Sequence, residues 1–274
     1  MWILIVYVPV THWVWGGGIL SSWGTMDFAG GIVVHATAGT AALITALTLG
    51  KRRGFPKSIT PPHSPILTMI GAAMLWVGWF GFNAGSALGA NGSAGMSMLV
   101  THISASTAAL VWMFIEWKRF GKPSLIGVVT GMVAGLATVT PASGYIGIPG
   151  GLVLGFSGGL LCYLAVDYIR GKLLIDDSLD VFAVHGVGCI LGTLLVAFLA
   201  TSTFSGLGLP EGQTAMSQFV VQIKAVILTV IWTSIFTYLI LKVTSLIVPL
   251  RVDEQEEIEG LDLRSHGEKG YHSD

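Results

Sequence analysis

Uncharged residues run along the chain in long stretches. Asp, Glu, Lys and Arg are absent from residues 1–26, 28–50, 58–115, 123–166, 181–210 and 225–241. A helix that crosses the apolar layer of a bilayer needs about 20 such residues, so the two longest stretches each hold two helices. The pattern therefore predicts eight membrane-spanning helices, at roughly residues 1–15, 29–50, 66–88, 96–116, 124–140, 146–168, 181–200 and 221–248.

The composition agrees with a chain that mostly faces lipid. Hydrophobic residues make up 53% of the 274 residues and charged residues 11%, whereas soluble domains have about 25% charged residues. A net charge of −1 gives no sign of a nucleic-acid partner. Cys162 and Cys189 lie singly in apolar stretches, without the spacing of a metal site or a disulfide framework. We expect an all-α polytopic membrane protein that uses no metal and no cofactor.

Basic residues follow every second predicted helix, and only Lys224 lies on the other side of the predicted topology. The remaining ones are Lys51, Arg52, Arg53, Lys57, Lys118, Arg119, Lys122, Arg170, Lys172, Lys242, Arg251, Arg264 and Lys269. Because Lys and Arg favour cytoplasmic loops, this alternation predicts that both termini are cytoplasmic. We expect residues 1–250 to form a transmembrane domain in the cell (plasma or inner) membrane and residues 251–274 to form a polar cytoplasmic tail.

Of the histidines inside the predicted helices, His35 and His185 lie in segments that also begin with an aspartate. An ionisable group at the centre of a span costs about 2.5–3.5 kcal/mol on insertion scales, so such groups usually have a function. His35 follows Asp27 by eight residues, and His185 follows Asp180 by five, in segments that resemble each other. Because the predicted topology runs these two helices in opposite directions, we interpret them as an inverted repeat with a site where the repeats meet.

Two facing imidazoles suit a pore for a small polar solute. A neutral imidazole has one donor and one acceptor nitrogen, so a pair offers polar groups without a fixed charge that would trap a cation. The sequence leaves open the alternative that the two histidines are unrelated and bond to nearby backbone. A metal site made of these two residues is disfavoured, because structural zinc takes four ligands.

Aromatic residues gather at the predicted outer ends of two helices. Trp79, Phe82 and Ser86 share one helical face, and Trp15 ends the first predicted helix. An indole face attracts a small cation by about 0.5–2 kcal/mol, so Trp15, Ser86 and Asp27 are candidates for recruiting a cation. Phe82 would then lie below them as a barrier to water and hydrated ions. An interfacial aromatic belt and a helix N-cap at Asp27 are the alternative interpretations.

Several segments together resemble the ammonium transporter family (Amt/Mep/Rh, with the Amt branch closest). They are Trp-Val-Trp-Gly-Gly-Gly at 13–18, Asp-Phe-Ala-Gly-Gly-Ile-Val-Val-His at 27–35, Gly-Trp-Phe-Gly-Phe-Asn-Ala-Gly-Ser at 78–86, Thr-Pro-Ala-Ser-Gly-Tyr-Ile-Gly at 140–147, Asp-Val-Phe-Ala-Val-His-Gly at 180–186, and Glu-Gly-Leu-Asp at 259–262 with Ser-His-Gly-Glu at 265–268.

This resemblance implies an inverted-repeat bundle of eleven helices in a homotrimer with one pore per subunit. The chain would correspond to spans four to eleven, so N-terminal spans are expected to be missing. The matched positions would be Trp15 and Ser86 as the external recruitment site, Asp27 as its support, Phe82 as a gate, His35 and His185 as twin pore histidines, and Trp79 as a pore-lining residue. Ammonium or ammonia would be the substrate, and a PII-type signal protein a cytoplasmic partner.

Transport of ammonium or ammonia is thus the function that the sequence favours. A sensor that binds ammonium but conducts little stays open because of the polar tail. A channel for water, glycerol or formate is disfavoured, since the chain has no Asn-Pro pair and no Lys or Arg at the centre of a span. An enzyme is not expected, because no catalytic arrangement or cofactor loop stands out.

Overall fold

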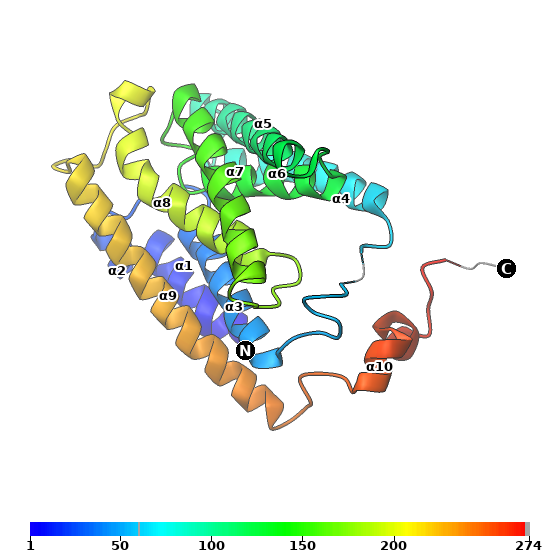
Figure 1. Ribbon diagram of the computed structural model, residues 1–274. Helices are drawn as coiled ribbons and strands as arrows, with labels where there is room; N and C mark the ends of the chain where they lie inside the picture. Colours follow the sequence, from blue (N-terminus) through cyan, green and yellow to red (C-terminus); the bar gives the residue numbers. More distant parts are fainter. Residues whose placement is uncertain (60, 272–274) are drawn as a thin grey trace.

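The computed structural model describes residues 1–59 and 61–271, and every regular element within them is a helix (Figure 1). The longer helices are α1 (Val8–Trp15), α3 (Thr37–Leu49), α4 (Pro65–Gly85), α5 (Gly92–Phe120), α6 (Leu125–Val139), α7 (Ile148–Gly171), α8 (Gly188–Leu199) and α9 (Ala215–Ser245). The shorter ones are η1 (Ile3–Tyr7), α2 (Ile19–Ser22), η2 (Gly31–Ala36), η3 (Phe182–Val187), η4 (Ser202–Phe204), α10 (Glu254–Glu259) and η5 (Asp262–His266).

Eight helical segments occupy the positions predicted for membrane spans. Among the described residues, 7 helical segments are long and apolar enough to cross a bilayer. The eighth, α6, has 15 residues, which is short of the about 20 that a lipid-facing span needs. Residues along α6 such as Leu136, Ala137 and Val139 are fully buried. A helix enclosed by other helices is shielded from lipid, so its length need not match the bilayer.

Helix α9 begins six residues before its predicted start. Its first turn is fixed by a capping box, in which the Thr214 hydroxyl accepts from the Ser217 backbone N–H and the Ser217 hydroxyl accepts from the Thr214 N–H. Gln218 and Gln222 on the following turns are fully buried. These polar residues look like a loop in a hydropathy pattern, although they bond to backbone groups of other segments, such as Gly24 and Met26.

The helices form two groups. Figure 1 shows α4, α5 and α6 together on one side and α1, α3 and α9 on the other, with α7 and α8 between them. Small residues let α6 approach its neighbours closely: a methyl group on Gly131 would overlap the Trp112 side chain, and one on Gly135 would overlap the Ser104 carbonyl. Such contacts pack membrane helices backbone to backbone.

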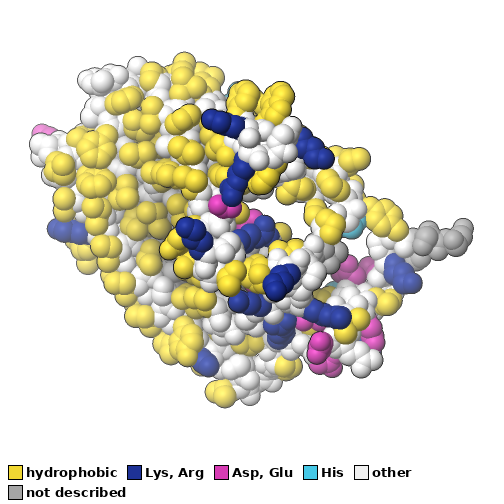
Figure 2. Space-filling model, in the orientation of Figure 1, with side chains coloured by type: hydrophobic (Ala, Val, Ile, Leu, Met, Phe, Trp, Pro, Cys, Tyr) yellow, Lys and Arg dark blue, Asp and Glu magenta, His cyan; other side chains and the backbone are white. Residues whose placement is uncertain are grey.

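Loops that carry the basic residues meet at one end of the bundle, which we call the basic end. It comprises the loops after α3, α5 and α7 and the tail after α9. Figure 2 shows most of the Lys and Arg side chains in that view gathered around these loops, while hydrophobic side chains cover the helical body. The opposite end, with Trp15 and Trp23, carries no basic residue in its loops before Lys224.

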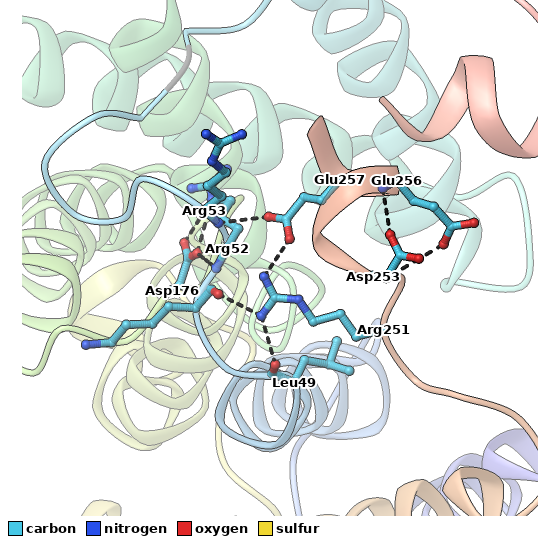
Figure 3. Close-up of polar contacts among 9 residues, drawn as sticks. Leu49, Arg52, Arg53, Asp176, Arg251, Asp253, Glu256 and Glu257 are labelled. Atoms are coloured by element: carbon cyan, nitrogen blue, oxygen red, sulfur yellow. Dashed lines mark hydrogen bonds and ion pairs between the residues drawn. The ribbon is translucent and has the colours of Figure 1, made fainter. Parts of the chain in front are cut away.

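A cluster of polar contacts holds the tail against the end of α3 (Figure 3). The Arg251 guanidinium donates to the carbonyl oxygens of Leu49 at 3.3 Å and Lys51 at 2.7 Å. The Glu257 carboxylate accepts from the Arg53 backbone N–H at 2.8 Å and from Arg251 Nη2 at 2.8 Å. The Arg53 N–H, and after it Arg251, hold the pKa of Glu257 below its usual range. We call these five residues the tail clamp.

The tail clamp predicts that Glu257→Gln loosens the tail. The amide side chain keeps the size of glutamate but loses the charge that strengthens both hydrogen bonds. Backbone amides of residues 251–266 should then exchange hydrogen for deuterium several-fold faster, in a measurement on detergent-solubilised protein.

Glu254→Gln is the matched control, because Glu254 lies on the same helix, is exposed and makes no side-chain hydrogen bond to a described residue. Equal exchange in the Glu257 variant and the wild type would contradict the clamp.

Candidate pore site

Two short π-helical segments carry the two histidines. His35 lies in η2, which continues into α3, and His185 lies in η3, which continues into α8. Single π-helical turns inside α-helices occur often at functional sites. The sequence analysis did not predict these segments, because a π-helical turn leaves no clear signal in hydrophobic periodicity.

The two histidine helices touch through glycine. A methyl group on Gly39 would overlap the backbone of Gly186. Gly39 lies one turn after His35, and Gly186 directly follows His185. The absence of side chains at this crossing lets the helices approach until their backbones are in contact, and this approach brings the imidazole rings together.

The imidazole rings meet edge to edge inside the bundle. Nδ1 of His35 lies 3.1 Å from Nδ1 of His185, with the ring planes 13° apart. His35 is 6% exposed. If both rings are neutral, one Nδ1 donates to the other, so one ring presents Nε2 as an acceptor and its partner presents an Nε2–H donor. The pair therefore keeps one donor and one acceptor available while it carries no net charge.

Trp79 and Phe82 of α4 form an aromatic wall beside the histidines. The Trp79 ring is parallel to His35 within 5° at a centroid distance of 5.2 Å, and parallel to His185 within 11° at 6.4 Å. The Phe82 ring lies 5.9 Å from His35 and is 40% exposed. The structure thus brings together four of the residues that sequence analysis selected: His35, His185, Trp79 and Phe82.

The Asp27 carboxylate caps the N-terminal end of the His35 helix. Its two oxygens accept from the backbone N–H groups of Gly30, Gly31, Ile32 and Val33 at 2.6–3.1 Å. The residue is 3% exposed. This is the geometry of an N-cap, so the carboxylate does not face a cation at the mouth. The Asp27 carbonyl also accepts from Trp15 Nε1 at 2.8 Å, a contact that fits the supporting role which the family resemblance implies for Asp27.

Asp177, rather than Asp180, is the counterpart of Asp27 in the second repeat. The Asp177 carboxylate accepts from the backbone N–H of Phe182 at 2.6 Å, and the residue is 5% exposed. Asp177 precedes His185 by eight residues, as Asp27 precedes His35. The sequence comparison aligned Asp180 with Asp27, because the residues next to Asp180 are more similar. The common eight-residue spacing was the signal that could have identified Asp177.

Trp15 and Ser86 lie at the end of the bundle opposite the basic end. Trp15 is 45% exposed and reaches over Gly30. Ser86 is half-buried, and its hydroxyl donates to the Phe82 carbonyl at 2.9 Å. Within residues 1–59 and 61–271, no hydrogen bond joins Trp15 to Ser86. Trp15 ends α1, and Ser86 caps the C-terminus of α4, the helix that carries the aromatic wall.

The histidine helices are also linked at the basic end. Arg52, just after α3, donates from its backbone N–H to Asp176 at 2.8 Å and pairs with it through Nε at 3.1 Å (Figure 3). A cavity of about 690 Å³ lies beside this link, between α3, the segment before η3 and the tail. Arg251 and Glu257 of the tail clamp form part of its wall. The tail therefore covers the space at the basic end of both histidine helices.

Asp180 lies at the same end, 3.3 Å from Arg170 Nε. Burial raises its pKa to about 6, although Arg170 acts in the opposite direction.

Among the described residues, no group of three or more His, Cys, Asp or Glu side chains is arranged to hold a metal ion.

These elements define a class of protein: a polytopic helical membrane protein whose central site is formed by two inverted histidine helices. A sequence profile of the Ammonium Transporter Family matches residues 1–271, and the chain belongs to that family. It is 47% identical over 272 residues to ammonium transporter Amt1 of Archaeoglobus fulgidus, covering 99% of this chain and 68% of that protein. An ammonium transporter of Aquifex aeolicus is also 47% identical over 272 residues, with 63% of its length covered.

Solved structures agree. A structure described as a sensor Amt protein superposes with a TM-score of 0.88 at 31% identity, covering 96% of this chain and 67% of that one. Saccharomyces cerevisiae Mep2 gives a TM-score of 0.78 at 36% identity, covering 90% and 59%. The family resemblance and the all-α membrane fold are therefore confirmed. The chain spans about two thirds of the length of these relatives.

The glycine crossing predicts that Gly39→Ala separates the histidines. A methyl group there would overlap the Gly186 backbone, and overpacking of this kind costs about 1–3 kcal/mol. The variant should unfold at a lower temperature in detergent and should lose most of any transport. Gly95→Ala is the control, because its methyl group would meet no atom within 4 Å. Similar melting temperatures for the two variants would show that the close crossing is not required.

The pKa of Asp180 predicts a pH dependence of stability. A carboxyl with a folded pKa of about 6 against an ordinary value of 3.8 binds its proton more tightly in the folded state. The protein therefore gains stability as the pH falls through about 6 towards 4, and this contribution is lost above about pH 6. Asp180→Asn should make the melting temperature nearly independent of pH between about pH 4 and pH 6. An unchanged pH slope in this variant would assign the dependence to another group.

Proposed function

We propose that the protein carries ammonium-derived nitrogen across a cell membrane, through a pore past His35 and His185. The observation that carries this proposal is the 3.1 Å contact between the buried His35 and the half-buried His185, beside Trp79. Family membership gives the substrate class, since the relatives at 47% identity are described as ammonium transporters.

A buried, neutral histidine pair favours ammonia over ions. Moving an ion from water into an apolar site costs several kcal/mol per ion even after relaxation. Ammonia has no charge, and it can donate to one Nε2 and accept from the other. A hydrated sodium or potassium ion would gain no compensating charge from Asp27, because that carboxylate is already bonded to four backbone N–H groups.

Recruitment would take place at the end opposite the basic end. The exposed indole of Trp15 attracts a cation, and the Ser86 hydroxyl supplies an acceptor. Phe82 separates this mouth from His35 and makes the passage apolar. An ammonium ion would lose its proton near this wall, so that ammonia passes the histidines. The proton could be relayed by the imidazole pair, because one Nδ1 already donates to the other.

The orientation follows from the basic residues. The basic end, with the tail clamp, would face the cytoplasm, and Trp15 would face outside. Few side chains of α4 are buried, among them Ala72, Trp79 and Asn83. This unpaired apolar face fits assembly into a homotrimer. The tail and the basic loops would be the surface for a PII-type regulatory protein.

The proposal predicts that His35→Ala with His185→Ala lowers uptake at least about tenfold, because ammonia then crosses an apolar gap without hydrogen-bonding partners. The measurement is labelled methylammonium uptake by ammonium-transport-deficient cells that express the gene product carrying this sequence. Protein amount in the membrane is measured alongside.

His102→Ala is the matched control. His102 is exposed on α5, and its ring lies 5.2 Å from that of Trp76 with the ring planes tilted by 30°. Unchanged uptake in the double variant would remove the mechanism. Ammonium-dependent signalling that persists in a transport-dead variant would instead favour a sensor.

A further inference from the structure

A chain of buried hydrogen bonds runs from the aromatic wall into the helical core. Trp79 Nε1 donates to Thr140 Oγ1 at 3.0 Å, and Thr140 Oγ1 donates to the Leu136 carbonyl at 2.7 Å. Asn83 Oδ1 lies 3.3 Å from the Thr140 hydroxyl. The Asn83 amide in turn donates to Thr101 Oγ1 at 2.9 Å. The chain connects α4, α5 and the C-terminal end of α6.

Every residue of this chain is shielded from solvent. Asn83, Thr101 and Thr140 are 0% exposed and Trp79 is 6% exposed. A buried polar atom that loses its partner costs about 1–3 kcal/mol, so the chain is held as a unit. The Thr101 hydroxyl completes it by donating to the Ser97 carbonyl at 2.7 Å.

The indole N–H is the only polar atom of Trp79, and therefore the only one that can fix the rotation of its ring by a hydrogen bond. The ring faces both histidines at nearly parallel angles. Trp76, on the same helix, shows the contrasting case: its buried Nε1 has no hydrogen-bond partner among the described residues. The bond to Thr140 thus singles out the tryptophan that covers the histidine pair.

The same end of α6 also contacts both histidine helices. The Cys189 thiol, one turn after His185, bonds to the Ala137 carbonyl. A methyl group on Gly31, in the first turn of the His35 helix, would overlap Pro141. Residues 136–141 therefore contact the three elements that carry His35, His185 and Trp79.

We infer that Thr140 is a positioning residue of the pore, which holds the Trp79 ring parallel to His35 and His185 through its hydroxyl. The inference rests on the proposed transport function. Loss of the Thr140 hydroxyl should therefore change the rate of passage without changing substrate binding. The Trp79 ring beside the histidines becomes free to rotate, while the surroundings of Trp15 and Ser86 at the mouth stay unchanged.

The test compares Thr140→Val, which removes the hydroxyl at nearly constant volume, with Thr140→Ser, which keeps it. Thr140→Val should lower the maximal rate of methylammonium uptake about fivefold or more and leave the KM within about twofold. Thr140→Ser should restore the rate to within about twofold of wild type. Thr130→Val is the control, since Thr130 lies on the same helix and bonds to the Ile126 carbonyl in the same way.

A second measurement does not depend on transport. In protein labelled with ¹⁵N-tryptophan, the indole N–H signal of Trp79 is the one that disappears in Trp79→Phe. It should shift and exchange faster with solvent in Thr140→Val, and stay near its wild-type position in Thr140→Ser and Thr130→Val.

The outcomes separate the two proposals. A wild-type protein without uptake overturns the proposed function, and the indole signal still tests the anchor. Any of three results overturns the role of Thr140: a wild-type uptake rate in Thr140→Val, an uptake rate in Thr140→Ser as low as that of Thr140→Val, or an indole signal in Thr140→Val at its wild-type position. If Thr140→Val does not accumulate in the membrane, Thr101→Val and Thr101→Ser replace the two Thr140 variants. The same changes in uptake rate and indole signal are then expected, with smaller magnitudes.

Discussion

The close contact between Gly39 and Gly186 is the constraint on which the site depends. Two imidazoles on separate helices reach hydrogen-bonding distance only if the helices cross almost backbone to backbone, and a side chain at Gly39 would overlap the Gly186 backbone and hold the helices apart. The Nδ1–Nδ1 distance of 3.1 Å is a consequence of that crossing. Buried carboxylates at the start of each histidine helix then fix how deep each ring lies.

Those carboxylates show how far the sequence allowed prediction. The eight helices and their alternating direction follow from charge-free stretches and from the positions of the basic residues. The meeting of His35 with His185 was one of two interpretations that the pattern left open, and the family resemblance favoured it. The predicted counterpart of Asp27 in the second repeat was three residues from the correct one. Local similarity favoured Asp180, whereas the carboxylate that accepts from the start of the His185 helix is that of Asp177. The function of a cap depends on its distance to the helix start, which similarity of neighbouring residues does not measure.

Other features required coordinates because they depend on contacts between segments distant in the chain. Thr140 and Trp79 are 61 residues apart, and the tail clamp joins residues about 200 apart. Hydropathy also treats polar residues as signs of loops, so the buried Gln218 was left outside the predicted start of α9. In an apolar bundle such residues are placed by their bonds to distant backbone groups, and single-residue patterns do not show these bonds.

A pore of this kind must satisfy two opposing requirements. It must be apolar enough to exclude ions, yet offer polar atoms to a small solute. The structure meets both requirements because its charged groups are bonded to other parts of the protein. Asp27 and Asp177 accept backbone N–H groups at the starts of the histidine helices, and Asp176 and Glu257 are paired with arginines at the basic end. In the proposed function, the atoms left to face the solute are imidazole nitrogens, whose neutral form both donates and accepts. The helix caps, the ion pairs and the glycine crossing therefore serve the same end: a passage that is polar without being charged.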